Sequence, residues 1–138
     1  MSERTARTLL LVEPETLLRR TVSLTARTLG LGEVHEAASL AEARRLLRDQ
    51  VFDGAMIAID CEACAGTPYD LGLLDLVRHG KSASAPGIPI AVLADSATTP
   101  MLHALRERDV RRVILKPFRA RVLLDAFAEF GAAAASDI

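Results

Sequence analysis

Aromatic residues are few in this chain of 138 residues, which has no tryptophan, one tyrosine and four phenylalanines. This scarcity argues against the stacking platforms on which many proteins bind bases or sugars. The formal net charge is only −1, whereas a nucleic-acid-binding surface would require a clear excess of positive charge. We therefore expect no DNA partner.

Long hydrophobic runs are also absent. No run reaches the roughly 18 apolar residues that a membrane span requires, and the first residues do not resemble a signal peptide. Two cysteines are too few for a disulfide scaffold in a chain of this size. We therefore expect a cytoplasmic protein with no membrane partner. The length predicts a single domain over residues 1–131, followed by a flexible tail over residues 132–138.

Five short apolar runs alternate with amphipathic stretches along the chain. The runs predict strands over residues 9–12, 33–37, 55–59, 88–93 and 113–115. The stretches that follow them predict helices over residues 14–29, from 39 onward, over 70–79, from 99 onward, and over 119–130. This alternation is typical of a three-layer α/β domain, in which a five-stranded parallel sheet is flanked by five helices.

Three of the predicted helices carry specific start signals. Pro14 suits the first turn of a helix, where its missing N–H costs nothing. Ser39 and Glu42 have the spacing of a capping box. Thr99 followed by Pro100 predicts a capping residue and the first helical residue of the fourth helix.

The segment Val113-Ile114-Leu115-Lys116-Pro117-Phe118 carries the strongest functional signal. It reads as a buried strand that ends in a lysine and a proline, in a chain with two lysines and fifteen arginines. A lysine in this setting indicates a position that needs a compact point charge, as for holding a phosphoryl or carboxylate group. Ligands of open parallel sheets bind beyond the carboxyl ends of the strands, where Glu13, Asp60 and Asp95 also fall.

These features resemble the receiver domain of bacterial response regulators. The matching segments are Leu10-Leu11-Val12-Glu13, Phe52-Asp53-Gly54-Ala55, Pro89-Ile90-Ala91-Val92-Leu93 and Leu115-Lys116-Pro117-Phe118. The resemblance covers about residues 7–130. It implies a CheY-like, flavodoxin-like fold, a role in two-component (phosphorelay) signal transduction, a lysine that contacts a phosphoryl group, and a cis peptide before Pro117.

Most of the active-site positions that the resemblance implies are changed in this chain. The first acid falls on Glu13 and the lysine on Lys116, and both are kept. The second acid falls on Pro14, the phospho-accepting aspartate on Ala58, the hydroxyl residue on Ala94 and the aromatic switch residue on Val113. A methyl group cannot accept a phosphoryl group, and magnesium requires oxygen ligands. We therefore expect a pseudo-receiver that works without an aspartyl phosphate and without a cofactor; Mg²⁺ would enter only if the pocket proved functional.

Asp60 supports a second hypothesis. It lies two residues beyond Ala58, on the same face of the strand, and a local shift would let it serve as a displaced phospho-acceptor near Lys116. The simpler interpretation is an acid at the mouth of a loop. Because a poorly hydrated lysine needs a partner, we expect Glu13 or Asp60 to form an ion pair with Lys116.

Two further motifs suggest different functions. Cys61 and Cys64 form a CxxC pair that would suit redox sensing or half of a zinc site, but no second ligand pair completes the zinc site. An arginine group comprises Arg108, Arg111, Arg112 and Arg119, together with Arg106 and Arg121. Guanidinium groups bind phosphates and stack on bases, so the first four form a candidate anion or cyclic-dinucleotide face. Ordinary loop cysteines and a solvated arginine surface are the simpler interpretations.

No hydrolase elbow, P-loop or dinucleotide fingerprint occurs in the sequence, so we do not expect an enzyme or a catalytic residue. We expect a stand-alone module that contacts another signalling protein, such as a histidine kinase, a phosphotransferase or a downstream target. Homodimerisation through the fourth helix, fifth strand and fifth helix is a further prediction. Phosphorylation on Asp60, and cyclic-dinucleotide or redox sensing, are the competing hypotheses.

Overall fold

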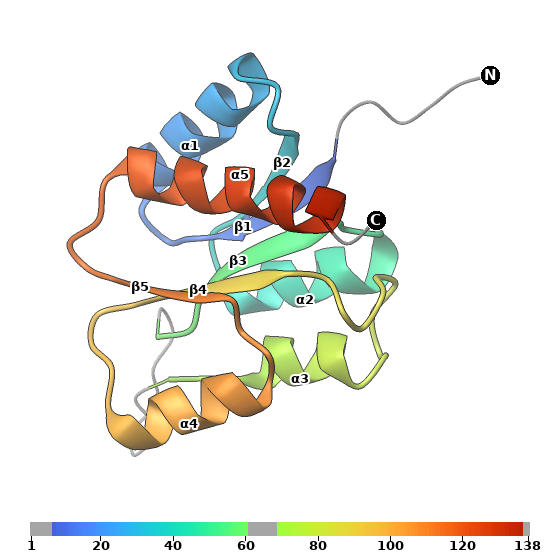
Figure 1. The fold of residues 1–138 in the computed structure, drawn as a ribbon, viewed down its shortest axis with the longest axis vertical. Coiled ribbons are helices and arrows are strands. Elements are labelled where there is room, and N and C mark those ends of the chain that lie inside the picture. The colour runs from blue at the N-terminus through green and yellow to red at the C-terminus, as the bar shows by residue number, and fades with distance from the viewer. Residues whose placement is uncertain (1–6, 61–68, 137–138) are drawn as a thin grey trace.

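A computed structural model describes residues 7–60 and 69–136 (Figure 1). Five strands form one sheet in the order β2-β1-β3-β4-β5, and all neighbouring strands are parallel. The strands are β1 Thr8–Val12, β2 Glu33–Ala37, β3 Gly54–Ala58, β4 Ile90–Ala94 and β5 Arg112–Leu115. The helices are α1 Thr16–Thr28, α2 Leu40–Asp49, α3 Gly72–Arg78, α4 Thr99–Glu107 and α5 Ala120–Ser136.

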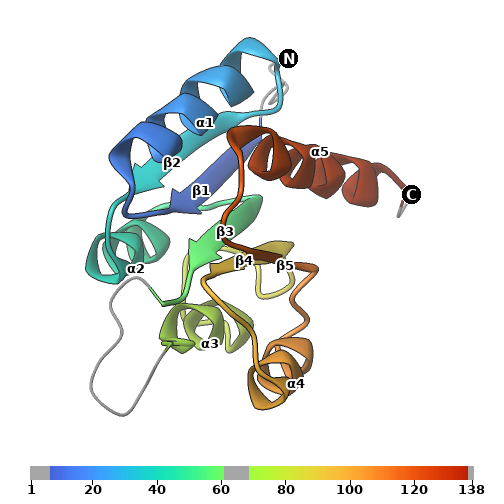
Figure 2. The ribbon, with the colours of Figure 1, turned by 90° about the vertical axis from the view of Figure 1, so that its left-hand side faces the viewer.

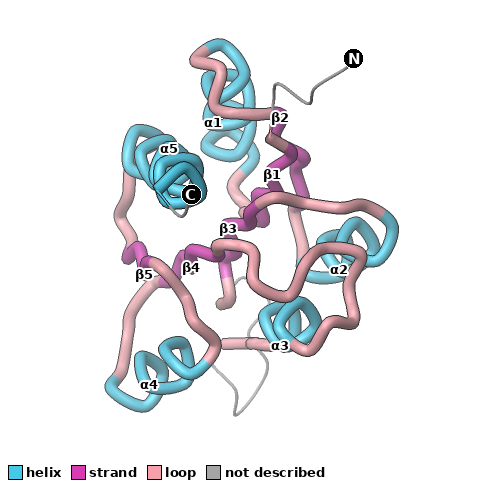
Figure 3. Tube along the Cα trace, turned by 45° about the vertical axis from the view of Figure 1, so that its right-hand side comes forward, coloured by secondary structure: helices cyan, strands magenta, loops and turns pink. Residues whose placement is uncertain are grey.

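Helices cover both faces of the sheet, which confirms the predicted three-layer architecture. α1 and α5 lie together on one face, and α2, α3 and α4 cover the other (Figures 2 and 3). Successive strand residues point to opposite faces, so Leu10 and Ile57 pack beneath α2 and α3, whereas Leu11 and Met56 pack beneath α1 and α5. Burial on both faces explains why the central strands are almost continuously apolar.

The strand order places one group of polar residues along a single edge of the sheet. All strands are parallel, so the residues that follow them emerge at the same carboxyl edge. Glu13 follows β1, Asp60 follows β3, Asp95 follows β4 and Lys116 follows β5. The chain leaves β1 toward β2 on one side, and β3 lies on the other side. Such a switch point is where open α/β sheets bind ligands.

The first helix begins later than predicted. α1 starts at Thr16 with Glu15 as its N-cap, so Pro14 precedes the helix instead of occupying its first turn. The physical reason is a local turn in which the Glu15 N–H donates to the Glu13 carboxylate over 2.8 Å. Because the Glu15 N–H is engaged in this turn, the helix begins only after Glu15. Pro14 then lies at the carboxyl edge of the sheet, where it lines a pocket.

The capping signals of α2 and α4 have different outcomes. The predicted cap of α2 at Ser39 is confirmed: the Ser39 hydroxyl accepts from the Glu42 N–H over 3.2 Å. The Glu42 carboxylate accepts from the Ala38 N–H over 2.7 Å. The predicted cap of α4 is wrong by one residue, because the Thr98 hydroxyl, not that of Thr99, accepts from the Met101 N–H over 3.2 Å. This shift moves the following proline to the second helical position.

The last helix is longer than predicted. α5 continues to Ser136 rather than ending near Phe130, so most of the predicted tail over residues 132–138 is helical. Residues 132–135 are four alanines, and alanine has the highest helix propensity of all residues. No helix in the described ranges is both long enough and apolar enough to cross a membrane.

Candidate functional site

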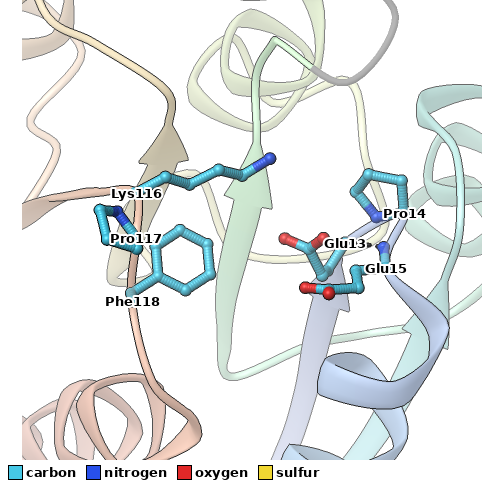
Figure 4. Close-up of a pocket in the computed structure, with 6 residues that line it drawn as sticks. All are labelled: Glu13, Pro14, Glu15, Lys116, Pro117 and Phe118. Atoms are coloured by element: carbon cyan, nitrogen blue, oxygen red, sulfur yellow. Dashed lines mark hydrogen bonds between the residues drawn. The ribbon is translucent and has the colours of Figure 1, made fainter.

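A pocket of about 670 Å³ opens at the carboxyl edge of the sheet. Its lining residues come from the end of β1 and the end of β5: Glu13, Pro14, Glu15, Lys116, Pro117 and Phe118. Figure 4 shows the Lys116 amine and the Phe118 ring on one side, with the Glu13 carboxylate turned toward them from the other. The Lys116–Pro117 peptide is cis, as the sequence resemblance implies.

Lys116 is held by an unexpected partner. Its Nζ atom lies 3.3 Å from Asp95 Oδ1, and within the described residues no ion pair joins it to Glu13 or Asp60. The predicted pairing is therefore wrong. The reason is the strand order: Asp95 follows β4, the direct neighbour of β5, whereas β1 and β3 lie further along the sheet. Burial lowers the pKa of Lys116, but the hydrogen bond and charge of Asp95, together with Glu13 and Asp60, raise it overall.

Asp60 positions that partner. Its Oδ2 atom accepts a hydrogen bond from the Asp95 backbone N–H over 2.6 Å, so the segment after β4 is tied to the end of β3. Lys116, Asp95 and Asp60 thus form a chain of contacts across three strand ends. The role of Asp60 as a phospho-acceptor stays a prediction. One of its two carboxylate oxygens already accepts the hydrogen bond from the Asp95 backbone.

Glu13 is fully buried and only half satisfied. Its Oε2 atom accepts from the Glu15 N–H over 2.8 Å, while its Oε1 atom has no hydrogen-bond partner among the residues the structure describes. Burial raises the pKa of Glu13, and the Glu15 N–H and the charge of Lys116 only partly offset that rise. An unpaired buried carboxylate oxygen is unfavourable unless something binds it.

The other predicted site positions do not line this pocket. Ala58 and Ala94 are buried at the ends of β3 and β4, and each packs into the core on a different face of the sheet. Val113 is partly buried and lines a separate groove of about 190 Å³ beside α4. The structure thus brings together Glu13, Pro14, Lys116 and Pro117, with Asp60 and Asp95 beside them.

Magnesium does not fit the residues that are present. Mg²⁺ prefers an octahedral set of oxygen ligands at short distance, and neither Pro14 nor Ala58 has a side-chain oxygen. No group of three or more histidine, cysteine, aspartate or glutamate residues in the described part of the chain could hold a metal ion.

Two of the four arginines of the candidate anion face are occupied by carboxylates of the chain itself. Arg108 Nε lies 2.7 Å from Asp75 Oδ1, and Arg112 Nη1 lies 3.0 Å from Glu129 Oε2. The remaining two members, at positions 111 and 119, are exposed. Nucleotide binding therefore stays a prediction, and two of the four guanidinium groups proposed for it already pair with carboxylates of the chain. Cys61 and Cys64 lie outside the described residues.

Arg78 has a structural role that the sequence did not indicate. Its guanidinium donates to the backbone oxygens of Arg108, Pro86 and Ile88 over 2.7, 2.6 and 2.8 Å, and burial lowers its pKa. In a chain with fifteen arginines, no local signal distinguishes Arg78 from the others. Asp95 was similarly missed as the partner of Lys116, although its position directly after a strand was visible.

Comparisons with known proteins identify the fold. No protein-family model matches the chain, and no curated protein matches its sequence. The solved structure of chemotaxis response regulator CheY4 of Vibrio cholerae has a TM-score of 0.72 and 21% identity, covering 91% of this chain and 99% of that chain. A CheY-like receiver domain protein from Methanospirillum hungatei JF-1 has a TM-score of 0.68 and 19% identity, with coverage of 93% and 98%.

A third similar structure is the signal receiver domain of an HD domain-containing protein from Pseudomonas fluorescens Pf-5. Its TM-score is 0.71 at 19% identity, and the match covers 95% of this chain and 98% of that one. All three are receiver domains, and the match runs over nearly the whole of each. At these identities the likeness shows that the chain has the receiver fold.

Proposed function

We propose that this protein is a receiver-fold signalling module that acts by binding another protein, without an aspartyl phosphate, a cofactor or an enzymatic activity of its own. The observation that carries the proposal is the pairing of Lys116. In the receiver fold this lysine is expected to hold a phosphoryl group, and here it is held by Asp95 at 3.3 Å. The chain supplies an internal anion to its own lysine.

The chemistry of the strand ends supports the same conclusion. Phosphorylation needs a carboxylate nucleophile, and the expected position holds the buried methyl group of Ala58. A phosphoryl group brought near Lys116 would also meet Glu13, Asp60 and Asp95, with no metal ligand set among the described residues to neutralise the repulsion. The pocket therefore disfavours the dianion for which the fold is otherwise suited.

The contact surface that we propose is formed by α4, β5 and α5. Leu102 on α4 and Leu115 on β5 are 43% and 44% exposed. Leu102 and Val113 line a groove between α4 and the start of β5. The groove together with the exposed leucines beside it supports a protein contact there. The proposed partner is another two-component signalling protein or a second copy of the chain.

A phosphorylation assay tests the proposal. The protein is incubated with acetyl phosphate and magnesium and then weighed by mass spectrometry, with a conventional receiver domain treated in parallel. We expect no adduct with the mass of a phosphoryl group on this chain. An adduct that disappears in Asp60→Asn would instead establish the displaced acceptor, and an adduct that survives in Asp60→Asn would also overturn the phosphate-free proposal.

A further inference from the structure

The pocket at the carboxyl edge carries more negative than positive charge. Glu13 and Glu15 line it, and Asp60 and Asp95 act on Lys116 from the neighbouring strand ends. These four carboxylates face one ammonium group, which leaves three negative charges in excess when all are ionised.

Arg19 does not change this balance. Its Nη1 atom donates to the Glu13 backbone oxygen over 2.7 Å, but its Nε atom lies 3.0 Å from Glu36 Oε1. The guanidinium is thus neutralised by a carboxylate on β2, and its hydrogen bond to Glu13 goes to the main chain. The side chain of Glu13 gains no partner from this arginine.

The Glu13 Oε1 atom, which lacks a hydrogen-bond partner among the described residues, indicates the kind of ligand. Glu13 is 0% exposed, and Oε1 has no partner among the described residues, although the residue lines the pocket. Figure 4 shows the carboxylate with one oxygen bonded to the Glu15 N–H and the other directed toward Lys116 and Phe118. A buried acceptor of this kind is best satisfied by a charged hydrogen-bond donor.

The remaining walls suit an alkyl chain. Pro14, Pro117 and Phe118 present apolar surface to the pocket, and the face of an aromatic ring attracts a cation as well as packing against methylene groups. Lys116 is 41% exposed and held by one exposed ion pair, so it can move aside at small cost. A metal ion would need several converging oxygens, whereas an alkylammonium group has three N–H donors, of which one would meet Glu13 Oε1 and the others would meet water at the pocket mouth.

We propose that this pocket binds an organic ammonium group on an alkyl chain, which donates to Glu13 Oε1 while the chain packs against Pro14 and Phe118. The group belongs either to a free primary amine or to a lysine side chain of a partner protein. The inference does not depend on the absence of phosphorylation, because it concerns Glu13 and not the phospho-acceptor position.

The test is an NMR titration of the full chain with pentylammonium and with Nα-acetyl-lysine amide. We expect saturable shifts of the backbone amides of Glu13, Glu15, Lys116 and Phe118. 1-Pentanol, which has the alkyl chain without the charge, and inorganic phosphate should bind at least about tenfold more weakly, since a hydrogen bond between charged groups is stronger than one to a neutral donor. Tighter binding of one amine over the other identifies the source of the group.

The matched variants are Glu13→Gln and Glu15→Gln. Glu13→Gln should weaken pentylammonium binding about tenfold or more, while Glu15→Gln removes an exposed lining charge and should weaken it less than about threefold. Should Glu13→Gln fail to fold, the wild-type protein itself provides the test: binding should be lost on acidification as Glu13 becomes protonated.

Three results would overturn the proposal. They are a titration without saturable shifts at Glu13 and Glu15, 1-pentanol binding as tightly as pentylammonium, and a folded Glu13→Gln variant that binds like the wild type. None of these results would bear on the phosphorylation assay, so the two proposals fail separately.

Discussion

The two edges of the sheet hold their cations in different ways. At the amino edge, ahead of β4 and β5, the Arg78 guanidinium donates to four backbone oxygens, those of Pro86, Ile88, Arg108 and Asp109. At the carboxyl edge, Lys116 has one exposed ion pair, and the buried Glu13 nearby keeps an oxygen without a partner within the described ranges.

The contacts at the amino edge contribute to stability, whereas the carboxyl edge has the features of a binding site. Four carbonyl oxygens around one guanidinium fix the end of α3 against the segments that enter β4 and β5. At the carboxyl edge, charged groups surround a pocket, and Glu13 Oε1 has no hydrogen-bond partner among the described residues. This is expected for the edge at which this architecture binds ligands. A substitution at the amino edge should therefore cost more stability than one at the carboxyl edge.

The largest effect is expected at the amino edge. Arg78→Met keeps the aliphatic stem but removes all the donors, so the carbonyl oxygens of Ile88 and Arg108, whose contacts are partly buried, lose their partner. We expect a loss of about 3 kcal/mol in the free energy of unfolding, measured by urea denaturation. The control is Arg111→Met, an exposed arginine nearby, which should change stability by less than about 0.5 kcal/mol. Equal losses in the two variants would contradict the proposed role of Arg78.

The second effect is a dependence on pH at the carboxyl edge. Burial raises the pKa of Glu13 above 4.5, so ionisation of Glu13 disfavours the folded state. Its contribution to stability is full below pH 4.5 and is lost as the pH rises through the raised pKa. The wild type should therefore lose stability relative to Glu13→Gln as the pH rises from 4.5 through the raised pKa of Glu13.

Urea denaturation of both proteins across that range measures this difference. Glu15→Gln, which alters an exposed carboxylate two residues away, is the matched control. A constant difference between wild type and Glu13→Gln at every pH would show that the carboxylate of Glu13 is not strained by its burial.

The smallest effect is expected from Asp95→Asn. The ion pair with Lys116 is exposed, so its removal should cost less than about 1 kcal/mol in the free energy of unfolding. The pKa of Lys116 should fall, because Asp95 is the main group that raises it. NMR titration of the Lys116 side chain measures that shift, and Asp49→Asn, far from the pocket, should leave it unchanged. A Lys116 titration unaltered in Asp95→Asn would assign the lysine another partner.

Features that depend on neighbouring residues were predictable from the sequence. The apolar runs predicted five strands, since burial on both faces requires continuous apolar sequence, and Ser39 with Glu42 predicted a cap that forms as expected. The segment ending in Lys116 and Pro117 indicated the place of a candidate site, and a pocket lies there.

Features that depend on contacts across the sheet were not predictable. The partner of Lys116 follows from the order of the strands, and sequence spacing does not contain that order. Arg78 contacts residues up to 31 positions away, so its role depends on packing that no local pattern encodes.

Residue type and local periodicity were enough to establish the alternation of strands and helices and the absence of a carboxylate at position 58. The folded chain was needed to establish that Asp95 neutralises Lys116 and that Glu13 is buried with an oxygen unused. Those outcomes depend on which strand ends become neighbours, and a hydrogen bond or ion pair forms only between groups that the fold brings within about 3 to 4 Å.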